Sequence, residues 1–302
     1  MERKAILVVD DEELIRESLV EFFEDDFDVE GAGSGEEALE ILERRNFDLV
    51  ISDIRMPGID GFEVIRVIRE KYPRTKTALI TAYDVDDYIK LAKEKQITNI
   101  IVKETPFNFD ELGQTSHNLL TGEFFGIHRY LDYDAKIEQL TIQETEAIQL
   151  TIGKIVDFFR GITNDEEIFE VCDLILDELL HNAIVHAPRD QDGKPKYDRT
   201  AQVVLADEEI VHVAFGYDQR KLGFAVIDNY GTLENSTVLD LLDRHISGSG
   251  TRDYQGRGLF ISRSLTDRFI INIHRGVKTE IICLIYFTGD HDYVKPLCIN
   301  EI

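Results

Sequence analysis

Several features that mark whole classes of protein are missing from this sequence. No stretch comes near the roughly 20 uncharged apolar residues that a membrane-spanning helix needs. The first residues, MERKAILVVDDEE, turn acidic after a short apolar run, which predicts a first β-strand and not a signal peptide. The chain also lacks low-complexity tracts and internal repeats. These absences favour a globular protein, and we expect it in the cytoplasm.

Basic character and paired cysteines are lacking too. The formal net charge is −26 and is divided evenly between the two halves, so neither half offers the cationic face that nucleic-acid binding needs. Surplus acid suits a partner with a basic surface, although it more often serves solubility. The three cysteines have neither metal-binding spacing nor an even disulfide framework. We therefore expect no direct contact with nucleic acid, and reduced cysteines in the core.

What the first half does contain is an alternation of apolar runs and amphipathic segments. The runs are short and continuous, which is typical of parallel strands buried on both faces. The predicted strands are residues 5–9, 27–32, 48–52, 77–80 and 99–102. The predicted helices are residues 12–24, 35–45, 60–71, 84–95 and 108–120. This order predicts a doubly wound α/β sheet, in a chain whose 302 residues allow two domains.

Polar residues follow four of these strands. Asp10 and Asp11 come after the first strand, Asp53 after the third, Thr81 after the fourth and Lys103 after the fifth. Because ligands of such sheets bind at the carboxyl ends of the strands, we expect the five side chains to share one crevice. One such aspartate alone is most simply an ordinary polar group at a strand end. The full ordered set favours a site.

The chemistry of that set is specific. Neighbouring carboxylates repel one another and attract a hard divalent cation, for which Mg2+ is the natural candidate. One carboxylate can then attack phosphorus while the metal and Lys103 neutralise the transferred oxygens. The Thr81 hydroxyl can hydrogen-bond a phosphoryl oxygen.

The motifs resemble the receiver domain of bacterial two-component response regulators. The resemblance covers about residues 3–120 and rests on VVDDE at 8–12, DIRMPGIDG at 53–61, TA at 81–82 and Lys103. Two positions depart from the family pattern. Ile100 stands where receivers usually carry an aromatic residue, and Lys103 is followed by Glu104 instead of proline. Tyr83 is an aromatic residue that could substitute for the missing one.

The resemblance implies a flavodoxin-like fold and a role for each residue of the set. Asp53 is implied to be the phospho-acceptor, with Asp10 and Asp11 joining it around Mg2+. Thr81 and Lys103 are implied to contact the phosphoryl group. A phosphoprotein of a phosphorelay, with a cognate histidine kinase as partner, is the expected biology.

The second half is organised differently. Residues 122–135 mix glycine with aromatic residues, which predicts a connector that packs against one or both domains. The connector separates a first domain at residues 1–121 from a second at residues 136–302. The predicted strands are 136–142, 200–206, 209–216, 222–228, 269–275 and 279–287. The predicted helices are 143–160, 166–187, 236–245 and a last one after the glycine-rich loop 247–258. These elements predict an α+β domain with an antiparallel sheet.

Two parts of this half are able to bind a nucleotide. Glu178, Asn182 and His186 lie on one face of the helix 166–187, where they form either a site or merely a solvated stripe. The loop 247–258 runs into a helix, and free backbone N–H groups at a helix N-terminus bind phosphate; a mobile surface loop is the plainer alternative. Asp228, at a strand end, can accept a hydrogen bond from an adenine amino group.

This half resembles the ATPase domain shared by gyrase, histidine kinases and MutL, the Bergerat or GHKL fold, and within that group the anti-sigma-factor serine kinases. The matching motifs are DELLHNAIVHA at 177–187, VIDNYG at 226–231 and GRGLFISRSLTD at 256–267, with Thr279 on a later strand. The family pattern in the second motif has two glycines, where this chain has Tyr230 and Thr232.

The resemblance implies an α+β sandwich that binds ATP with Mg2+. The implied roles, each carried over to a matching position, are catalytic base for Glu178, Mg2+ ligand for Asn182, adenine contact for Asp228, phosphate contacts for Gly256, Arg257 and Gly258, and a nucleotide contact for Thr279.

Two hypotheses of function follow. The first is a receiver-controlled serine/threonine protein kinase that acts on an anti-anti-sigma protein or sequesters a sigma factor. A homodimer is compatible with this hypothesis. The second is a non-catalytic, phosphorylation-regulated binding switch with a degenerate nucleotide site, which Tyr230 and Thr232 favour. A histidine kinase ranks below both, because no histidine-bearing dimerisation hairpin precedes the second half. A transcription factor also ranks below, because no basic recognition helix follows the first.

Overall fold

The computed structural model describes residues 3–104, 106–190, 192–198, 201–248, 257–287 and 294–302. The chain divides into two compact units, one comprising Met1–Phe124 with Pro296–Cys298 and the other Phe125–Lys295 with Ile299–Ile302. Across the described ranges, no helix combines the length and the apolar character needed to cross a bilayer.

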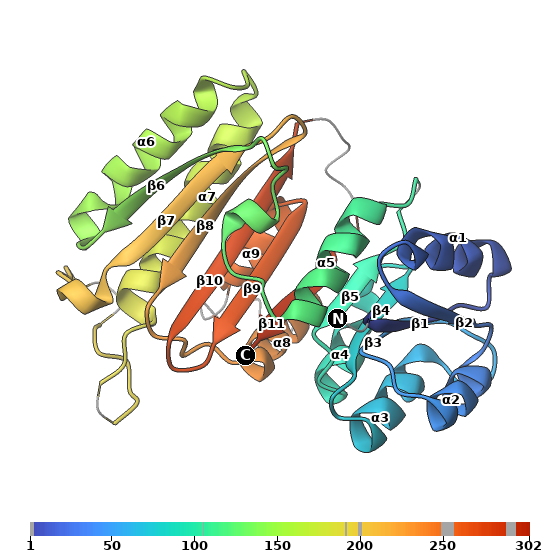
Figure 1. Cartoon of the computed structure of the whole chain (residues 1–302). Helices are drawn as coiled ribbons and strands as arrows, with labels where there is room; N and C mark the ends of the chain where they lie inside the picture. Colours follow the sequence, from blue (N-terminus) through green and yellow to red (C-terminus); the bar gives the residue numbers. More distant parts are fainter. Residues whose placement is uncertain (1–2, 105, 191, 199–200, 249–256, 288–293) are drawn as a thin grey trace. The chain divides into compact units, whose positions relative to one another are not determined.

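The first unit is built on a parallel sheet with the strand order β2-β1-β3-β4-β5 (Figure 1), the flavodoxin-like order. Its strands are β1 (Ala5–Val9), β2 (Asp28–Ala32), β3 (Leu49–Asp53), β4 (Lys76–Thr81) and β5 (Asn99–Val102). Its helices are α1 (Glu13–Glu24), α2 (Gly35–Arg44), α3 (Gly61–Lys71), the short η1 (Val85–Tyr88) with α4 (Ile89–Glu94), and α5 (Phe109–Thr121). The predicted doubly wound sheet is thus confirmed.

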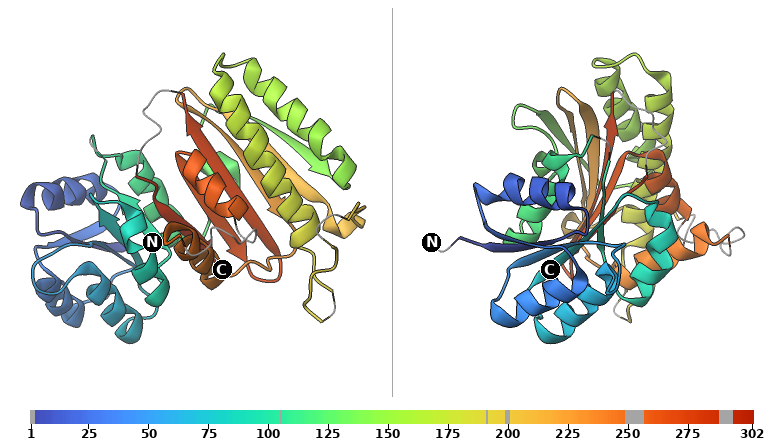
Figure 2. Two further views of the ribbon diagram at one scale, coloured as in Figure 1. Left: turned by 180° about the vertical axis from the view of Figure 1, so that it is seen from behind. Right: turned by 90° about the vertical axis from the view of Figure 1, so that its right-hand side faces the viewer.

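Helices cover both faces of this sheet, and the strand β1 shows why its run of apolar residues is unbroken. Ala5, Leu7 and Val9 pack on the side of α2 and α3. Ile6 and Val8 point to the opposite side, where α1 and α5 lie (Figure 2). Successive side chains of a strand alternate between faces, so a sheet covered on both sides needs apolar residues at every position.

The first unit also takes in a short piece from the end of the chain. Leu297 and Cys298 begin strand β11 (Leu297–Glu301) and pair antiparallel with Ile100 and Asn99 of β5. The sequence analysis did not predict this strand. The pairing covers part of the β5 edge, whose backbone groups would otherwise be open to another strand.

The second unit has an antiparallel sheet with the order β9-β10-β8-β7-β6. The strands are β6 (Lys136–Ile142), β7 (Val211–Tyr217), β8 (Lys221–Asp228), β9 (Arg268–His274) and β10 (Lys278–Tyr286). The helices are α6 (Ile148–Arg160), α7 (Glu166–His181), α8 (Asn235–Ile246) and α9 (Arg257–Leu265), with short turns η2 (Ile127–Arg129), η3 (Thr145–Ala147) and η5 (Asp207–Glu209). Helices α6, α7 and α9 lie together over one face of the sheet (Figure 2, left), so this unit is an α+β sandwich.

Two expectations for this unit were wrong. Among the described residues, 201–206 form no ladder strand but only an isolated antiparallel bridge between Val204 and Glu144, in which the Leu205 N–H donates to Gln143 O (2.7 Å). The predicted helix 166–187 is α-helical only to His181 and continues as a π-helical turn, η4 (Asn182–His186). The wider π turn changes the angle per residue, so the row from Glu178 through Asn182 does not extend in α-helical register to His186.

Residues 125–135 of the connector belong to the second unit and are held against its sheet, on the face opposite the helices (Figure 1). Its Gly126, at φ +100°, donates its N–H to both carboxylate oxygens of Glu280 (3.0 and 2.9 Å). Asn272 Nδ2 donates to the same carboxylate (2.9 Å), and Asn300 Nδ2 donates to Asn272 Oδ1 (2.9 Å). Glu280 is 1% exposed, so a buried carboxylate fixes the point where the second unit begins.

Glu280 should make stability depend on pH. Burial raises the pKa of Glu280 above its ordinary value of 4.5, and hydrogen bonds from Asn272 and Gly126 offset only part of this. The stabilisation that comes from the protonated acid is therefore fully present below about pH 4.5 and is lost as the pH rises through the folded-state pKa. Glu280→Gln cannot ionise, so its stability should gain on wild type as the pH rises from 4.5 to about 8.

Urea unfolding at a series of pH values measures this difference. The exposed Glu138→Gln on β6 is the matched control and should follow wild type. A gap between Glu280→Gln and wild type that stays constant with pH would contradict the prediction.

Candidate functional site

Four of the five predicted receiver residues gather at one end of the first unit's sheet. Asp10 follows β1, Asp53 and Thr81 end β3 and β4, and Lys103 follows β5, so all stand at carboxyl ends of parallel strands. Asp10, Asp53 and Thr81 are buried. Asp11, beside them in the chain, is exposed.

A shared cation joins the two buried carboxylates. Lys103 Nζ lies 2.8 Å from Asp10 Oδ2 and 2.5 Å from Asp53 Oδ1. The Lys103 side chain is 5% exposed. Removing one partner from a buried ion pair typically costs about 3–5 kcal/mol, so the three charges hold this arrangement together.

Backbone hydrogen bonds position the two carboxylates and the loop that carries Lys103. Asp53 Oδ2 accepts from the N–H of Arg55 (2.7 Å), and Asp10 Oδ1 accepts from the N–H of Glu12 (3.0 Å). Lys103 N–H donates to the carbonyl of Thr81 (2.7 Å), which fixes the start of the β5 loop beside the end of β4. The loop after each strand therefore orients the side chain at its end.

The electrostatics of the cluster follow from burial and crowding. Burial raises the pKa of Asp53, Asp10 adds to this, and Lys103 offsets only part of it. For Lys103, burial alone would lower the pKa, but hydrogen bonds to Asp10 and Asp53 outweigh burial and raise it. The lysine thus stays protonated, and the site as a whole holds more carboxylate than it holds positive charge.

The carboxylates suit a hard cation. Mg2+ is commonly held by one or two protein carboxylates together with phosphate oxygens and water. Asp10 and Asp53 supply two carboxylates within reach of one cation, as the position of Lys103 Nζ between them shows. The described residues contain no group of three or more His, Cys, Asp or Glu side chains placed to hold a metal ion. The donor set therefore fits Mg2+ that is completed by phosphate and water.

In the second unit, the start of α9 approaches the end of α7. A Cβ atom added to Gly258 would stand 2.5 Å from Glu178 Oε2 and 3.4 Å from Asn182 Nδ2. The absence of a Cβ at Gly258 leaves room for this close approach, which brings three of the predicted residues together at a helix N-terminus. Arg257 opens the same helix and is exposed, whereas Gly256 lies outside the described residues.

A second cluster lies at the end of β8. Asp228 is 8% exposed and pairs in register with Thr279 of β10. Its Oδ1 accepts from the N–H groups of Tyr230 (2.9 Å) and Gly231 (3.3 Å). Burial raises the pKa of Asp228, and these two hydrogen bonds offset only part of it. Thr279 is buried beside this carboxylate, and its hydrogen bonds also lower the pKa of Asp228 against the effect of burial.

The altered glycine motif has a clear geometry. Gly231 has φ +58°, and a Cβ there would stand 2.1 Å from the carbonyl oxygen of His274, so this position requires glycine. Burial raises the pKa of Tyr230, and Glu209 adds to this. The Tyr230 side chain is half-buried within the second unit.

Two functional candidates were missed in the sequence. Arg55 Nε donates to the hydroxyl of Tyr88 (2.6 Å), and the Arg55 guanidinium carbon lies 3.9 Å from the centre of the Tyr83 ring. The sequence analysis singled out Tyr83 but gave no role to Arg55 or Tyr88. A position two residues after Asp53 was the available signal, but nothing local predicts its partner 33 residues further on.

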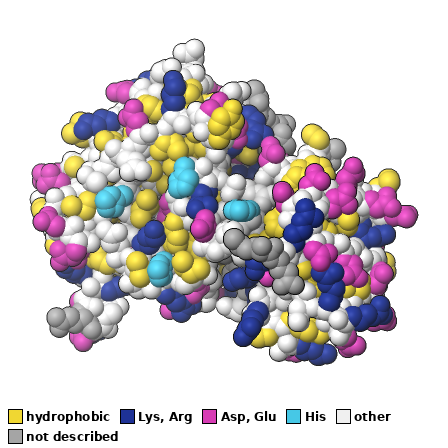
Figure 3. Space-filling view, in the orientation of Figure 1, with side chains coloured by type: hydrophobic (Ala, Val, Ile, Leu, Met, Phe, Trp, Pro, Cys, Tyr) yellow, Lys and Arg dark blue, Asp and Glu magenta, His cyan; other side chains and the backbone are white. Residues whose placement is uncertain are grey.

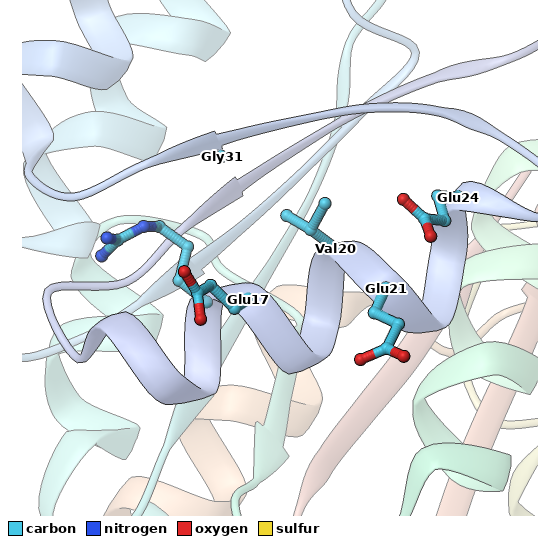
Figure 4. Close-up of a pocket in the computed structure, with 6 residues that line it drawn as sticks. Glu17, Val20, Glu21, Glu24 and Gly31 are labelled. Atoms are coloured by element: carbon cyan, nitrogen blue, oxygen red, sulfur yellow. The ribbon is translucent and has the colours of Figure 1, made fainter.

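A surface pocket on the first unit has a different lining. It is lined by Arg16, Glu17, Val20, Glu21 and Glu24 of α1 and by Gly31 of β2 (Figure 4). Acidic side chains are also prominent on this part of the visible face in Figure 3. None of the predicted site residues lines the pocket.

Comparisons with known proteins concern the first unit. Residues 6–116 match the family model described as "Response regulator receiver domain". Sporulation initiation phosphotransferase F of Bacillus subtilis is 33% identical over 113 residues, which are 37% of this chain and 90% of that protein. A cyclic di-GMP phosphodiesterase of Thermotoga maritima is 30% identical over 125 residues, 41% of this chain but 33% of that protein.

Among solved structures, the response regulator TrrA of Thermotoga maritima in complex with Mg(2+)-BeF is 45% identical, with a TM-score of 0.35 over 39% of this chain and 99% of that one. The chain spans a third of the phosphodiesterase and about a fifth of the response regulator FleR of Pseudomonas aeruginosa. What those proteins do as wholes therefore does not pass to this chain.

Proposed function

The chain belongs, through residues 6–116, to the response regulator receiver domain family, and we propose that phosphorylation of Asp53 controls an ATP-binding output domain. The proposed parts are a receiver at 1–121, a connector at 122–135 and an output domain at 136–302. One observation carries the receiver part: Asp10 and Asp53 converge on Lys103 at 2.8 and 2.5 Å.

Each step of the proposed phosphoryl transfer can be assigned to one of these residues. A carboxylate oxygen of Asp53 attacks the phosphorus of a phosphohistidine on a partner kinase, an O–P bond forms, and the P–N bond of the donor breaks. Lys103 neutralises charge on the phosphoryl oxygens, and Thr81 offers a hydroxyl at the end of the neighbouring strand. Asp10 and Asp53, with Asp11 beside them, would hold Mg2+, which when bound neutralises further phosphoryl charge.

For the output domain, the supporting observation is the contact of Gly258 with Glu178 and Asn182. ATP phosphates would bind at the N-terminus of α9, where Arg257 and Gly258 lie and where free N–H groups and the helix dipole attract anions; the predicted contact Gly256 lies outside the described residues. Asn182 would share Mg2+ with these phosphates, and Glu178 would accept a proton from the attacking hydroxyl.

The adenine end of the nucleotide would lie at Asp228. This carboxylate accepts the backbone N–H groups of Tyr230 and Gly231 and would accept one more hydrogen bond from an adenine amino group. The Thr279 hydroxyl, in register with Asp228 on the neighbouring strand, would bind nearby. A fold of the GHKL type, and an action on a serine or threonine of an anti-anti-sigma protein or on a sigma factor, complete the proposal.

The second candidate is a binding switch without catalysis. It is favoured by Tyr230, which brings a ring into a position where the resembled family has glycine. In this version the output domain binds its partner in a phosphorylation-dependent way, and its nucleotide site is only a remnant.

Calorimetric titration with ATP and Mg2+ separates the two candidates. We expect binding with a sub-millimolar Kd in wild type and at least about tenfold weaker binding in Asp228→Asn, because hydrogen bonds to a charged group typically contribute about 1.5–3 kcal/mol. Glu178→Gln should bind ATP but fail to transfer its γ-phosphoryl group to a protein substrate. Asp173→Asn, an exposed change on α7, is the control. No heat at millimolar ATP would overturn the kinase proposal and leave the binding switch.

A further inference from the structure

The Arg55 side chain links the phospho-acceptor loop to the segment that leads into α4. Its backbone N–H donates to Asp53 Oδ2 (2.7 Å), so this residue is tied directly to the carboxylate. Its Nε donates to the Tyr88 hydroxyl (2.6 Å), and its guanidinium stacks on the ring of Tyr83, 3.9 Å from the ring centre. One residue therefore contacts both the reacting group and the 83–88 segment.

Tyr88 is well placed to convert a change at Arg55 into a change of backbone. It ends η1 and precedes the first residue of α4, and it is 9% exposed. Its ring packs against Phe62 of α3, with ring centres 5.9 Å apart. The hydroxyl at the tip of this buried ring is held by Arg55. This hydrogen bond from a charged donor holds the tip of the ring, so Tyr88 should shift when Arg55 leaves.

Phosphorylation changes what Arg55 is attracted to. A phosphoryl group carries about −1.5 to −2 charges at neutral pH and offers three strong acceptor oxygens. Phosphorylation converts the singly charged Asp53 carboxylate into a more highly charged acyl phosphate, so the site gains negative charge that attracts any cation within reach. A guanidinium matches phosphate oxygens with paired N–H donors, a much stronger interaction than its bond to a neutral phenol. The Arg55 side chain is exposed and lies two residues from Asp53, so only its contacts with Tyr88 and Tyr83 must break for it to turn toward the phosphoryl group.

From these contacts we propose that Arg55 is a positioning residue that reports the phosphorylation state of Asp53 to the η1–α4 segment. With Asp53 unmodified, Arg55 holds the Tyr88 hydroxyl and stacks on Tyr83. With Asp53 phosphorylated, the guanidinium moves to the phosphoryl oxygens, and Tyr88 and the start of α4 rearrange. The inference rests on the proposed phosphorylation of Asp53.

Thermodynamic linkage predicts that substitutions of Tyr88 and Arg55 change the affinity for a phosphoryl mimic in opposite directions. If phosphorylation must break the Arg55–Tyr88 bond, then removing the Tyr88 hydroxyl must favour the phosphorylated state by the same factor. We therefore expect Tyr88→Phe to bind beryllofluoride with Mg2+ about fivefold or more tightly than wild type. Arg55→Ala loses the contact with the phosphoryl mimic and should bind it several-fold more weakly.

The test uses the full chain and two readouts. The first is beryllofluoride affinity in Mg2+, and the second is amide hydrogen exchange of residues 84–94 with and without beryllofluoride. In wild type the mimic should raise exchange in this segment several-fold. In Tyr88→Phe and Arg55→Ala exchange should be high already, with less than a twofold further change. Tyr72→Phe, the same substitution at the end of α3, is the control and should behave as wild type.

The outcomes distinguish the proposed role of Arg55 from the proposed phosphorylation of Asp53. Unchanged affinity and an unchanged exchange response in both variants would overturn the role of Arg55, as would weaker binding in Tyr88→Phe, which a purely structural tyrosine predicts. Failure of acetyl phosphate to modify wild-type Asp53 would instead overturn the proposed phosphorylation. Because Arg55 is exposed, its alanine variant should fold even if the change at buried Tyr88 does not.

Discussion

Replacing Asp53 with asparagine is expected to abolish phosphorylation of this chain by acetyl phosphate in the presence of Mg2+. The amide has nearly the shape of the carboxylate, so it can still accept the N–H of Arg55, but it lacks the negative oxygen that attacks phosphorus. It also removes one of the two carboxylates that face Lys103. Intact-protein mass spectrometry after incubation with acetyl phosphate should find the added phosphoryl group on wild type and none on the variant.

The control for this experiment is Asp26→Asn, which changes an exposed aspartate in the same unit and should leave labelling unchanged. Circular dichroism would establish that both variants are folded. Labelling of Asp53→Asn to the wild-type extent would show that another residue accepts the phosphoryl group.

Replacing Gly61 with alanine should both destabilise the first unit and disturb the phospho-acceptor. A Cβ at this position would stand 2.1 Å from the backbone carbonyl oxygen of Asp53, and a backbone atom at the end of a central strand cannot easily move away. Overpacking of this kind typically lowers the free energy of unfolding by about 1–3 kcal/mol, and we expect about 3 kcal/mol or more for a clash with a backbone atom. Amide exchange of β3 and β4, followed against urea concentration, reports this loss for the first unit alone.

The matched control is Gly153→Ala in α6, where an added Cβ has no neighbour within 4 Å. Alanine should stabilise that helix by about 0.5–1 kcal/mol, because glycine loses more conformational freedom on folding. A loss at Gly61→Ala no larger than about 0.5 kcal/mol would show that the loop after β3 can relax around the new atom.

Most of the first unit could be predicted from the sequence because each signal there is local. Strands such as β1 are apolar at every position since both faces of a parallel sheet are covered, and that pattern is visible in five residues. The convergence of Asp10, Asp53 and Lys103 also followed, since parallel strands joined by helices all end at the same edge. The exposure of Asp11 did not follow, because the direction of a side chain in a loop depends on the loop's conformation.

The second unit was less predictable where local patterns compete with distant partners. The alternating residues 200–206 have strand-like composition, yet the N–H groups of Val203 and Leu205 bond to residues 143–145. The run to His186 has helical periodicity, but nothing in it distinguishes an α-helical from a π-helical final turn. Strand β11 depends on a partner strand almost 200 residues earlier in the chain.

The sequence by itself determined which segments of the first unit are strands, the residues at the ends of those strands and the chemistry that those residues can perform. These features depend on short-range periodicity and on a topology that has few alternatives. Only the tertiary structure decided that Arg55 bonds Tyr88, that Gly126 bonds Glu280, and that Gly258 lies against Glu178. Each of these contacts joins segments far apart in the chain, and its geometry is set by the packing of whole helices and strands, which no local pattern of residues encodes.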